Sequence, residues 1–309
     1  MLGDIDVVLL WVDGDDPAWR QEFSRYVTLE EGDKSEARFR DWDNLQYMFR
    51  SFENCTPWVR KIHFVTWGHV PAWLNVGHPK LNIVNHRDIL SKHNLPVFNS
   101  RAIECNIHRI NGLADKFIYF NDDMFVLRKL RPEYFFIKER PRDLFALNII
   151  STDITAHMKI NNIKILNKHF NKKKVMFDNF AKWFSFRNGI EFIKSILLLP
   201  WPQFTGLYSH HLPQPFLKST FEKVWSLEKE ILELTSSSRF KKSSDVNQFL
   251  FKWWQILEGG FVPKSYSRAK KISLWTKEDV KEAAGLIYNN KLEVICLNDH
   301  LSDGSFRRI

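Results

Sequence analysis

The chain has 309 residues, enough for one large domain or two small ones with a hydrophobic core. Hydrophobic residues make up 44% of it and charged residues 26%, as in ordinary soluble globular proteins, and the net charge of +9 suits an anionic partner without identifying it. No apolar run reaches the ~20 residues that span a bilayer, and Cys55, Cys105 and Cys296 lack the spacing of metal ligands. Because the chain opens on a strand that carries Asp4 and Asp6, and not on a signal peptide, we expect a cytoplasmic protein with buried thiols.

The first part of the chain alternates predicted strands and helices. Strands separated by helices indicate a Rossmann-like α/β fold, with a mainly parallel central sheet and helices on both faces. In such sheets, ligands bind at the carboxyl ends of the strands. The strands are expected at residues 5–12, 61–68, 81–84 and 116–126, and the helices at 37–52 and at 100–112, the latter with Ser100 as its N-cap.

Two of these strands end in carboxylates. Asp13, Asp15 and Asp16 follow the first strand, and Asp122 and Asp123 interrupt the fourth. If the two strands are neighbours, both acidic groups lie at one edge of the sheet, where like charges repel. Such an arrangement makes sense if a divalent cation, Mg²⁺ or Mn²⁺, lies between the carboxylates and a bound diphosphate.

The same residues also have ordinary structural interpretations. Asp13 and Gly14 fit a tight turn, and Asn121 with Asp122 could cap a solvated turn. Asp15 and Asp16 are more typical of turns and helix N-caps than of metal ligands. The residues alone leave these alternatives open.

The pattern changes beyond Pro141. Residues 155–205 are rich in Lys, Asn and Phe and are predicted to be mostly helical. Within them, residues 190–201 are strongly apolar but too short to span a membrane, which indicates a core helix or one that rests on the inner membrane leaflet. Lys182, Arg187 and Lys194 lie near or in this run and suit an anionic membrane surface.

Further helices are expected at 218–234, at 245–257 with Ser244 as N-cap, and at 277–288. A last strand at 294–297 is expected to end at Asn298 and Asp299. We expect a single catalytic domain over residues 1–309, in which residues 141–260 form a mostly helical lid or acceptor-binding subregion.

Four blocks of the sequence are distinctive together, although each is weak alone. They are IDVVLLWVDGDDPAW at residues 5–19, the stretch from RFRDWDNLQYMFRSF at residue 38 to FNDDMFV at residue 126, SHHLPQPF at 209–216 with SSRFKKSSDVNQ at 237–248, and ICLND at 295–299. In this order the blocks resemble the Stealth proteins, which include bacterial capsule and exopolysaccharide phosphotransferases and the catalytic subunit of the lysosomal GlcNAc-1-phosphotransferase. The chain departs from that pattern at Gln46, where a basic residue is usual, and at Asn111, where Pro is common.

The resemblance implies a reaction. Stealth enzymes transfer a sugar 1-phosphate from a nucleotide sugar, commonly a UDP-sugar, to a hydroxyl of an acceptor glycan, so that a phosphodiester forms and a nucleoside monophosphate is released. The alternative is a glycosyltransferase that attacks the anomeric carbon and releases UDP. A nucleic-acid-binding protein is disfavoured, because acidic strand ends repel a polyanion and the chain has no aromatic-basic recognition motif. The donor sugar, the acceptor and the oligomeric state stay open.

The resemblance also implies roles for residues of this chain. Asp122 and Asp123, with Asp299, are the expected metal ligands, and Asp13 is expected to orient the acceptor or the nucleotide. His211 is the expected general base, and its neighbour His210 is treated as incidental. The remaining assignments are Arg239 as a phosphate-binding catalytic group, Glu104 as a catalytic group that grips a sugar hydroxyl or an arginine, and Trp11, Gly14, Arg40, Arg50, Asn121, Asp245 and Asn298 as substrate-binding residues.

Overall fold

A five-stranded sheet forms the centre of the molecule, in the order β3-β2-β1-β4-β8. The structure is a computed structural model that describes residues 3–35, 39–153 and 155–301, apart from the side chain of residue 186. Neighbouring strands of the sheet run parallel from β3 to β4, and only β8 is antiparallel, which confirms the predicted mainly parallel α/β fold. The strands are β1 (Ile5–Leu10), β2 (Ile62–Thr66), β3 (Leu81–Asn85), β4 (Lys116–Asn121) and β8 (Gln214–Leu217).

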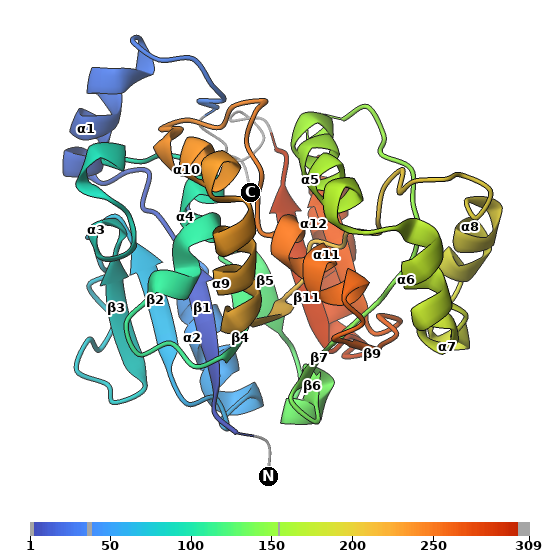
Figure 1. The fold of residues 1–309 in the computed structure, drawn as a ribbon. Coiled ribbons are helices and arrows are strands. Elements are labelled where there is room, and N and C mark those ends of the chain that lie inside the picture. Colours follow the sequence, from blue (N-terminus) through green and yellow to red (C-terminus); the bar gives the residue numbers. More distant parts are fainter. Residues whose placement is uncertain (1–2, 36–38, 154, 302–309) are drawn as a thin grey trace.

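Both faces of this sheet are covered, so its central strands β1 and β4 are mostly apolar and buried. Successive side chains of a strand point to opposite faces, and β1 therefore sends Val8 and Leu10 into one core and Val7 and Leu9 into another. In Figure 1, α4, α9 and α10 lie in front of the sheet and α2 lies behind it. These helices are α2 (Leu45–Cys55), α4 (Ser100–Asn106), α9 (Lys218–Leu227) and α10 (Lys229–Ser237).

One carboxylate interrupts the apolar run of β1. Asp6 is fully buried near the amino-terminal edge of the sheet, where it accepts hydrogen bonds from Arg60 Nε (2.9 Å) and from the backbone N–H groups of Lys61 (3.2 Å) and Ala114 (2.8 Å). Oδ2, the oxygen that accepts from the Ala114 N–H, also lies 3.0 Å from His63 Nε2. Burial alone would raise the pKa of Asp6, but His63 and Arg60 outweigh it and lower the pKa. Both oxygens of the buried Asp6 carboxylate thus have hydrogen-bond partners within the protein.

The predicted strand at 116–126 is two strands that belong to different sheets. β4 ends at Asn121, Asp122 and Asp123 form a turn, and β5 (Met124–Val126) then pairs antiparallel with β11 (Val294–Asp299). A further strand that the sequence did not predict, β10 (Ala269–Leu274), pairs parallel with β11 and completes a sheet in the order β10-β11-β5. The expected last strand is confirmed but extends through Asn298 and Asp299.

Several predicted helices have different ends. α2 begins at Leu45, so Arg40 lies in a loop, while residues 37 and 38 lie outside the described residues. The cap of α4 is Asn99, not Ser100, because the Asn99 side chain accepts a hydrogen bond from the Arg101 N–H. The helix expected at 218–234 is broken at Glu228 into α9 and α10.

Of the two predicted C-terminal helices, one has a different start and the other has the predicted ends. The helix expected at 245–257 begins only at Phe249, so Ser244 is not its cap, and it is α11 (Phe249–Leu257). By contrast, α12 (Lys277–Tyr288) has the predicted ends, and Thr276 with Asp279 closes a capping box at its start. α1 (Pro17–Val27) was not among the predicted helices, and Asp16, expected to be a turn or cap residue, caps it by accepting from the Trp19 N–H.

The predicted helical character of residues 155–205 is confirmed, and part of the chain beyond Pro141 shares the core of the sheet. Leu250 and Trp254 of α11 belong to the same apolar cluster as Val8 of β1 and Phe117 of β4. The other elements are α3 (His86–Ile89), α5 (Ala156–His169), α6 (Lys172–Asp178), α7 (Phe180–Trp183), α8 (Glu191–Leu197), the short 3₁₀ turns at Lys92–Asn94, Ile107–Arg109, Pro132–Tyr134 and Phe186–Asn188, and a small sheet of β6 (Phe136–Ile137), β7 (Arg140–Asp143) and β9 (Val262–Pro263).

The apolar run at 190–201 is not a core helix. Ile190, Ile193 and Leu197 expose 72%, 56% and 67% of their surface, and Trp201 exposes 52%. Figure 1 places α8 and α7 at the end of the molecule farthest from β3. Within the described part of the chain, every helix is too short or too polar to cross a membrane.

Candidate active site

The two acidic groups predicted from the sequence lie at one edge of the central sheet. β1 and β4 are adjacent and parallel, and Leu10 pairs with Asn121 in their register. The loop after β1, with Asp13, and the turn of Asp122 and Asp123 after β4 therefore leave the same edge. The sequence-based expectation that these strands are neighbours is confirmed.

Hydrogen bonds and a close backbone contact fix the loop after β1. The Asp13 N–H donates to His69 Nε2 (2.8 Å), and the Asp13 carboxylate accepts from the Asp15 N–H (2.8 Å). A Cβ atom added to Gly14 would lie only 2.1 Å from the Phe39 carbonyl oxygen. A glycine is therefore required at position 14 chiefly because any larger residue would collide with the backbone of Phe39, and less because of the turn itself.

That segment brings a carboxylate that the sequence analysis missed. Asp41 is near enough to interact with a carboxylate of each acidic group, Asp13 and Asp122: burial and the charges of Asp13 and Asp43 raise its pKa. Burial, with the charges of Asp123 and Asp41, likewise raises the pKa of Asp122 to about 7. The buried Trp11, a predicted substrate-binding residue, stacks on Phe64 with the ring centroids 5.6 Å apart. Among the described residues, neither Asp41 nor Asp122 forms an ion pair with a lysine or an arginine, so negative charge accumulates at this edge.

A chain of polar contacts connects this edge to α4 and to β11. The Tyr119 hydroxyl lies 3.2 Å from Glu104 Oε1 and also donates to Asn121 Oδ1. The Asn121 side-chain amide lies 3.3 Å from His211 Nε2. The structure therefore brings together three of the predicted site residues, Glu104, Asn121 and His211.

The chain continues from His211 to the acidic turn. His211 Nε2 lies 3.1 Å from Asp123 Oδ2, and the Cys296 thiol lies 3.2 Å from the same oxygen. Burial alone would lower the pKa of His211, but Asp123 outweighs burial and raises it. Conversely, burial would raise the pKa of Asp123, and His211 and the Cys296 thiol outweigh it and lower the pKa. His211 and Asp123 thus form an imidazole–carboxylate pair.

The residues at this turn fit a divalent cation. Asp123 Oδ1 is buried and has no hydrogen-bond partner, and Asp122 lies beside it. Carboxylate oxygens are the ligands that Mg²⁺ and Mn²⁺ prefer, so Asp122 and Asp123 could hold such an ion. Within the described residues, the grouping of three ligand side chains with donor atoms within 4.8 Å is Asp123, His211 and Cys296. Its nitrogen and sulfur donors would suit a softer metal such as Zn²⁺.

Asp299, the third predicted metal ligand, lies in a different setting. Its Oδ2 accepts hydrogen bonds from Arg40 Nη1 (2.7 Å) and Trp42 Nε1 (3.1 Å), and its Oδ1 accepts from the Leu301 N–H (2.8 Å). Both oxygens are therefore engaged by protein donors. Asp299 holds the segment of Arg40 and Asp41 in place. The sequence predicted instead that Asp299 binds the metal together with Asp122 and Asp123.

Arg239 and Asp245 lie on the loop between α10 and α11. Arg239 donates from Nε to the Pro96 carbonyl (2.9 Å), forms an ion pair with Glu30 and lies over the ring of Tyr26, 4.2 Å from its centroid. None of its contacts described here reaches His211 or Asp123. The structure therefore does not bring Arg239 together with the base.

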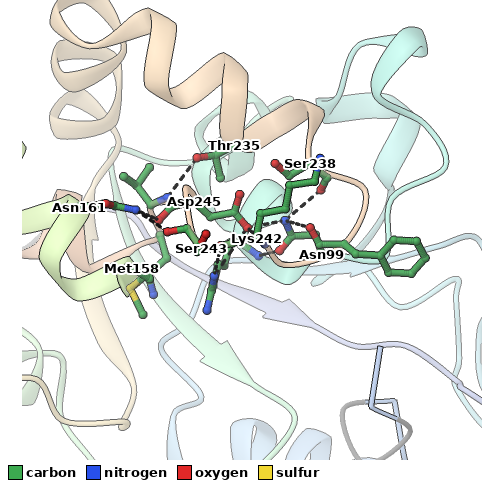
Figure 2. A network of polar contacts seen from close by, with 12 residues as sticks. Asn99, Met158, Asn161, Thr235, Ser238, Lys242, Ser243 and Asp245 are labelled. Carbon is green, nitrogen blue, oxygen red and sulfur yellow. Dashed lines mark hydrogen bonds and ion pairs between the residues drawn. The ribbon is translucent and has the colours of Figure 1, made fainter. Parts of the chain in front are cut away.

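Asp245 is fully buried and is neither at a helix start nor open to a ligand. Figure 2 shows it in a network in which its carboxylate accepts from the Asn99 amide (3.0 Å) and from the Lys242 N–H (2.8 Å). The Asn99 amide also donates to the Ser238 carbonyl (2.9 Å). This network joins the Arg239 loop to the start of α4, the helix that carries Glu104.

The last two predicted residues lie at the surface. Arg50 on α2 is exposed, with its guanidinium over the ring of Tyr47. The Asn298 amide contacts the ring of His300. The sequence missed Asp41 and Cys296, although Cys296 stands in the ICLND block, because its thiol meets Asp123 only through the pairing of β5 with β11.

Comparison with known proteins identifies the family. The models for Stealth protein CR1, conserved region 1, and Stealth protein CR2, conserved region 2, match residues 3–28 and 38–143. The capsular polysaccharide phosphotransferase WcwK of Streptococcus pneumoniae is 36% identical over 99% of this chain and 92% of its own length. The receptor polysaccharide phosphotransferase WefC of Streptococcus gordonii is 39% identical over 97% and 91%.

Among solved structures, the galactosyltransferase LgtC with donor and acceptor sugar analogs matches 94% of this chain and 86% of its own. The identity is 12% and the TM-score 0.38, so this likeness is too low to carry an argument. The sequence relatives, in contrast, extend over nearly the whole chain and confirm the resemblance carried by its four blocks. The chain belongs to the Stealth protein family.

Proposed function

We propose that this protein is a metal-dependent phosphotransferase of capsule or surface polysaccharide synthesis. It transfers a sugar 1-phosphate from a nucleotide sugar, a UDP-sugar, to a hydroxyl of an acceptor glycan, which yields a phosphodiester and UMP. The observation that carries the proposal is the contact of His211 with Asp123, beside Asp122, at the carboxyl edge of the sheet. The names of its relatives, polysaccharide phosphotransferases, support the same reaction.

His211 is the proposed general base. With its Nε2 held by Asp123 Oδ2, the neutral ring keeps its proton at Nε2, and Nδ1 can accept the proton of the acceptor hydroxyl. Asp123 then stabilises the imidazolium that forms, just as it raises the pKa of the ring in the free protein. Tyr119, which also contacts Glu104, holds Asn121, whose side-chain amide lies 3.3 Å from the same Nε2 of His211.

Mg²⁺ or Mn²⁺ is the proposed cofactor, held by the Asp122 carboxylate and the free Oδ1 of Asp123. When bound, such an ion offsets the negative charge of the donor diphosphate. Asp41 lies close enough to influence Asp122, and Asp13 in turn influences Asp41; Asp13 is proposed to orient the nucleotide or the acceptor. Arg239 is the proposed phosphate-binding cation, which requires its guanidinium to exchange Glu30 for a phosphate oxygen.

Product identity tests this proposal. The protein is incubated with UDP-sugars, Mg²⁺ and an acceptor extract, and the released nucleotides are separated by ion-exchange chromatography. Metal-dependent UMP without UDP is expected, because attack occurs at phosphorus. Release of UDP would mean attack at the anomeric carbon, as in a glycosyltransferase, and would refute the reaction. The variant His211→Gln is the negative control: it lacks the proposed base and should release no UMP.

We further infer a peripheral contact of α6–α8 with an anionic membrane. The exposed apolar side chains on and next to α8 are accompanied by Phe177 and Phe180, which expose 84% and 62% of their surface. Lys173 and Lys174 lie on α6 and Lys194 on α8, where Lys174 pairs with Asp178 and Lys194 with Glu191. An apolar surface with flanking cations is typical of proteins that lie on anionic lipid.

Co-sedimentation with liposomes tests this contact. Binding is expected with phosphatidylglycerol vesicles and to be much weaker with phosphatidylcholine alone. The double variant Ile193→Ser/Leu197→Ser, changed at two exposed positions, should lose binding while its fold and its turnover of a soluble acceptor stay the same. Equal sedimentation of wild type and variant would refute the contact.

A further inference from the structure

A second polar cluster surrounds His210, the neighbour of the proposed base in the chain, and has no part in the proposed chemistry. Asp143, the last residue of β7, is fully buried, with His210 Nε2 3.1 Å and the Tyr266 hydroxyl 3.2 Å from its Oδ1. Lys252 of α11, also fully buried, has its Nζ 3.1 Å from Asp143 Oδ2 and 2.8 Å from His210 Nε2. Lys264 closes the cluster, with its Nζ 3.2 Å from the centroid of the Tyr134 ring. Residues from β7, α11 and the loop after β9 thus converge on His210.

Such a cluster is hard to explain by stability alone. Removing two lysines and a carboxylate from water is costly, and apolar replacements of buried ion pairs are often neutral or stabilising. What a buried cluster of charged and hydrogen-bonded side chains supplies is a defined position for each of its members. Asp143, Lys252 and Tyr266 together hold the imidazole of His210 in one place.

The position of His210 matters because of the chain segment on which it lies. Among the described backbone hydrogen bonds, the last before this segment is from the Tyr208 N–H to the Ala146 carbonyl (2.9 Å), and the next is in β8 from Gln214 onward. Residues 209–212 between them form no backbone–backbone hydrogen bond within the described part of the chain. The segment is therefore held by its side chains, with His210 in the polar cluster and Leu212 in the apolar core.

His210 and His211 are adjacent, yet they contact different parts of the protein. His210 reaches Asp143 and Lys252, and His211 reaches Asp123 and Asn121. A displacement of the backbone at residue 210 would displace the neighbouring imidazole by a similar amount. A misplacement of ~1 Å can cost a reaction about a hundred-fold in rate.

We propose that Asp143, Lys252 and His210 are positioning residues that fix His211 against Asp123. The proposal rests on the proposed function in one respect, that His211 acts as the base, and it adds residues that the Stealth motifs did not single out. The mostly helical subregion at residues 141–260 thereby helps to position the base, because Lys252 belongs to its helix α11.

Two readouts on one set of variants test the proposal. His210→Phe keeps an aromatic ring but removes both polar contacts, and His210→Gln restores a polar nitrogen near the place of Nε2. The control is Lys172→Met, which removes another buried lysine, one whose Nζ donates to the carbonyls of Leu198 and Trp201 (both 2.7 Å). Steady-state kinetics gives kcat and KM, and the imidazole ¹⁵N chemical shifts of His211, in protein labelled at histidine, report its contact with Asp123 without any substrate.

We expect His210→Phe to lower kcat by about ten- to a hundred-fold with little change in the donor KM, and to shift the ¹⁵N signals of His211. His210→Gln should recover most of the rate, and Lys172→Met should keep kcat and the His211 signals. Wild-type kcat and signals in His210→Phe, or an equal loss of kcat in Lys172→Met, would overturn the proposal. If His210→Phe does not fold, Tyr266→Phe, which removes only a hydroxyl, is expected to change both readouts in the same direction, and unchanged values would count against the proposal. If the wild type releases no UMP, the proposed function fails, and the ¹⁵N signals still decide the positioning.

Discussion

Carboxylates that are buried or half-buried occur at both edges of the central sheet, and their surroundings differ. At the amino edge, Asp6 contacts Arg60, His63 and two backbone N–H groups, and its pKa is lowered. At the carboxyl edge, Asp122 lies among other carboxylates, which with burial raise its pKa to about 7, and one oxygen each of Asp123 and Glu104 is buried without a hydrogen-bond partner. The first arrangement stabilises the fold, and the second costs stability.

The difference separates a structural carboxylate from a functional one. A buried charge with complete partners holds neighbouring strands together, and its removal leaves those partners unsatisfied. Carboxylates that repel each other and keep free oxygens gain their partners only when a ligand binds. The carboxyl edge is therefore where the protein gives up stability for binding, which agrees with the general location of ligands in open α/β sheets.

The largest expected effect follows from neutralising the carboxyl edge. Asp122→Asn should lower kcat by about a thousand-fold, because a ligand of the proposed cation is lost. In EDTA its melting temperature should equal or exceed that of the wild type, since one of several like charges is gone. Added Mg²⁺ should raise the melting temperature of the wild type and leave that of the variant unchanged.

Asp15→Asn is the matched control for this change. Asp15 belongs to the same edge, but its side chain is 83% exposed and pairs with Arg20. Turnover and the response to Mg²⁺ should stay close to wild type. A large loss of turnover in Asp15→Asn, or full activity in Asp122→Asn, would remove the distinction between the acidic turn and the loop around it.

Neutralising the amino edge should have the opposite result. Asp6→Asn leaves Arg60 without its buried anion, and we expect it to lower the free energy of unfolding by about 3–5 kcal/mol in chemical denaturation. Turnover per folded molecule should change less than about two-fold, because the site lies at the other end of the strands. A marked loss of kcat in fully folded Asp6→Asn protein would show that the two edges are coupled.

The pH dependence of this loss has a definite sign. The pKa of Asp6 is lowered from its ordinary value of 3.8, so its contribution to stability is present above that value and is lost as the pH falls through the lower folded value. Wild type and Asp6→Asn should therefore differ most at neutral pH and converge in acid. Denaturation curves at pH 7, 5, 4 and 3 measure the convergence.

A smaller effect is expected at Gly14, where the acidic loop meets the segment of Asp41. Gly14→Ala places a Cβ 2.1 Å from the Phe39 carbonyl, so the segment must move, at a cost of about 1–3 kcal/mol in the free energy of unfolding and with loss of turnover. Gly285→Ala in α12 is the control, because a Cβ there meets nothing within 4 Å and should stabilise the helix by about 0.5–1 kcal/mol. An active, stable Gly14→Ala protein would contradict the close contact.

The smallest effect concerns a histidine in the segment that leads into β4. Burial, with the charges of Arg109 and Lys218, lowers the pKa of His108 to about 3. The unfolded chain takes up a proton below its ordinary pKa of 6.5 and the folded protein does not, so the stability that depends on neutral His108 is lost as the pH falls below 6.5. His108→Phe should reduce the slope of unfolding free energy between pH 6 and 4 by up to about 1.4 kcal/mol per pH unit, with unchanged turnover. An identical slope in the variant would contradict the burial of a neutral ring.

The sequence by itself determined the architecture of the sheet and the edge at which the site lies. The apolar run of β1 requires a strand that is buried on both faces, and parallel strands must end at one edge, so Asp13 and Asp123 had to lie near each other once β1 and β4 were neighbours. The Stealth blocks added His211. These predictions succeed because they depend on local patterns and on the direction of the chain.

Only the tertiary structure decided which side chains meet. His211 and Asp123 are 88 residues apart in the chain, Cys296 and Asp123 are 173 apart, and Arg40 and Asp299 are 259 apart, and no local pattern specifies such pairs. His210, which seemed incidental beside His211, proved to be the buried one, held by Asp143 and Lys252. The physical reason is that hydrogen bonds depend on positions within about 3 Å, and strand order and helix packing set these only when the whole chain is folded.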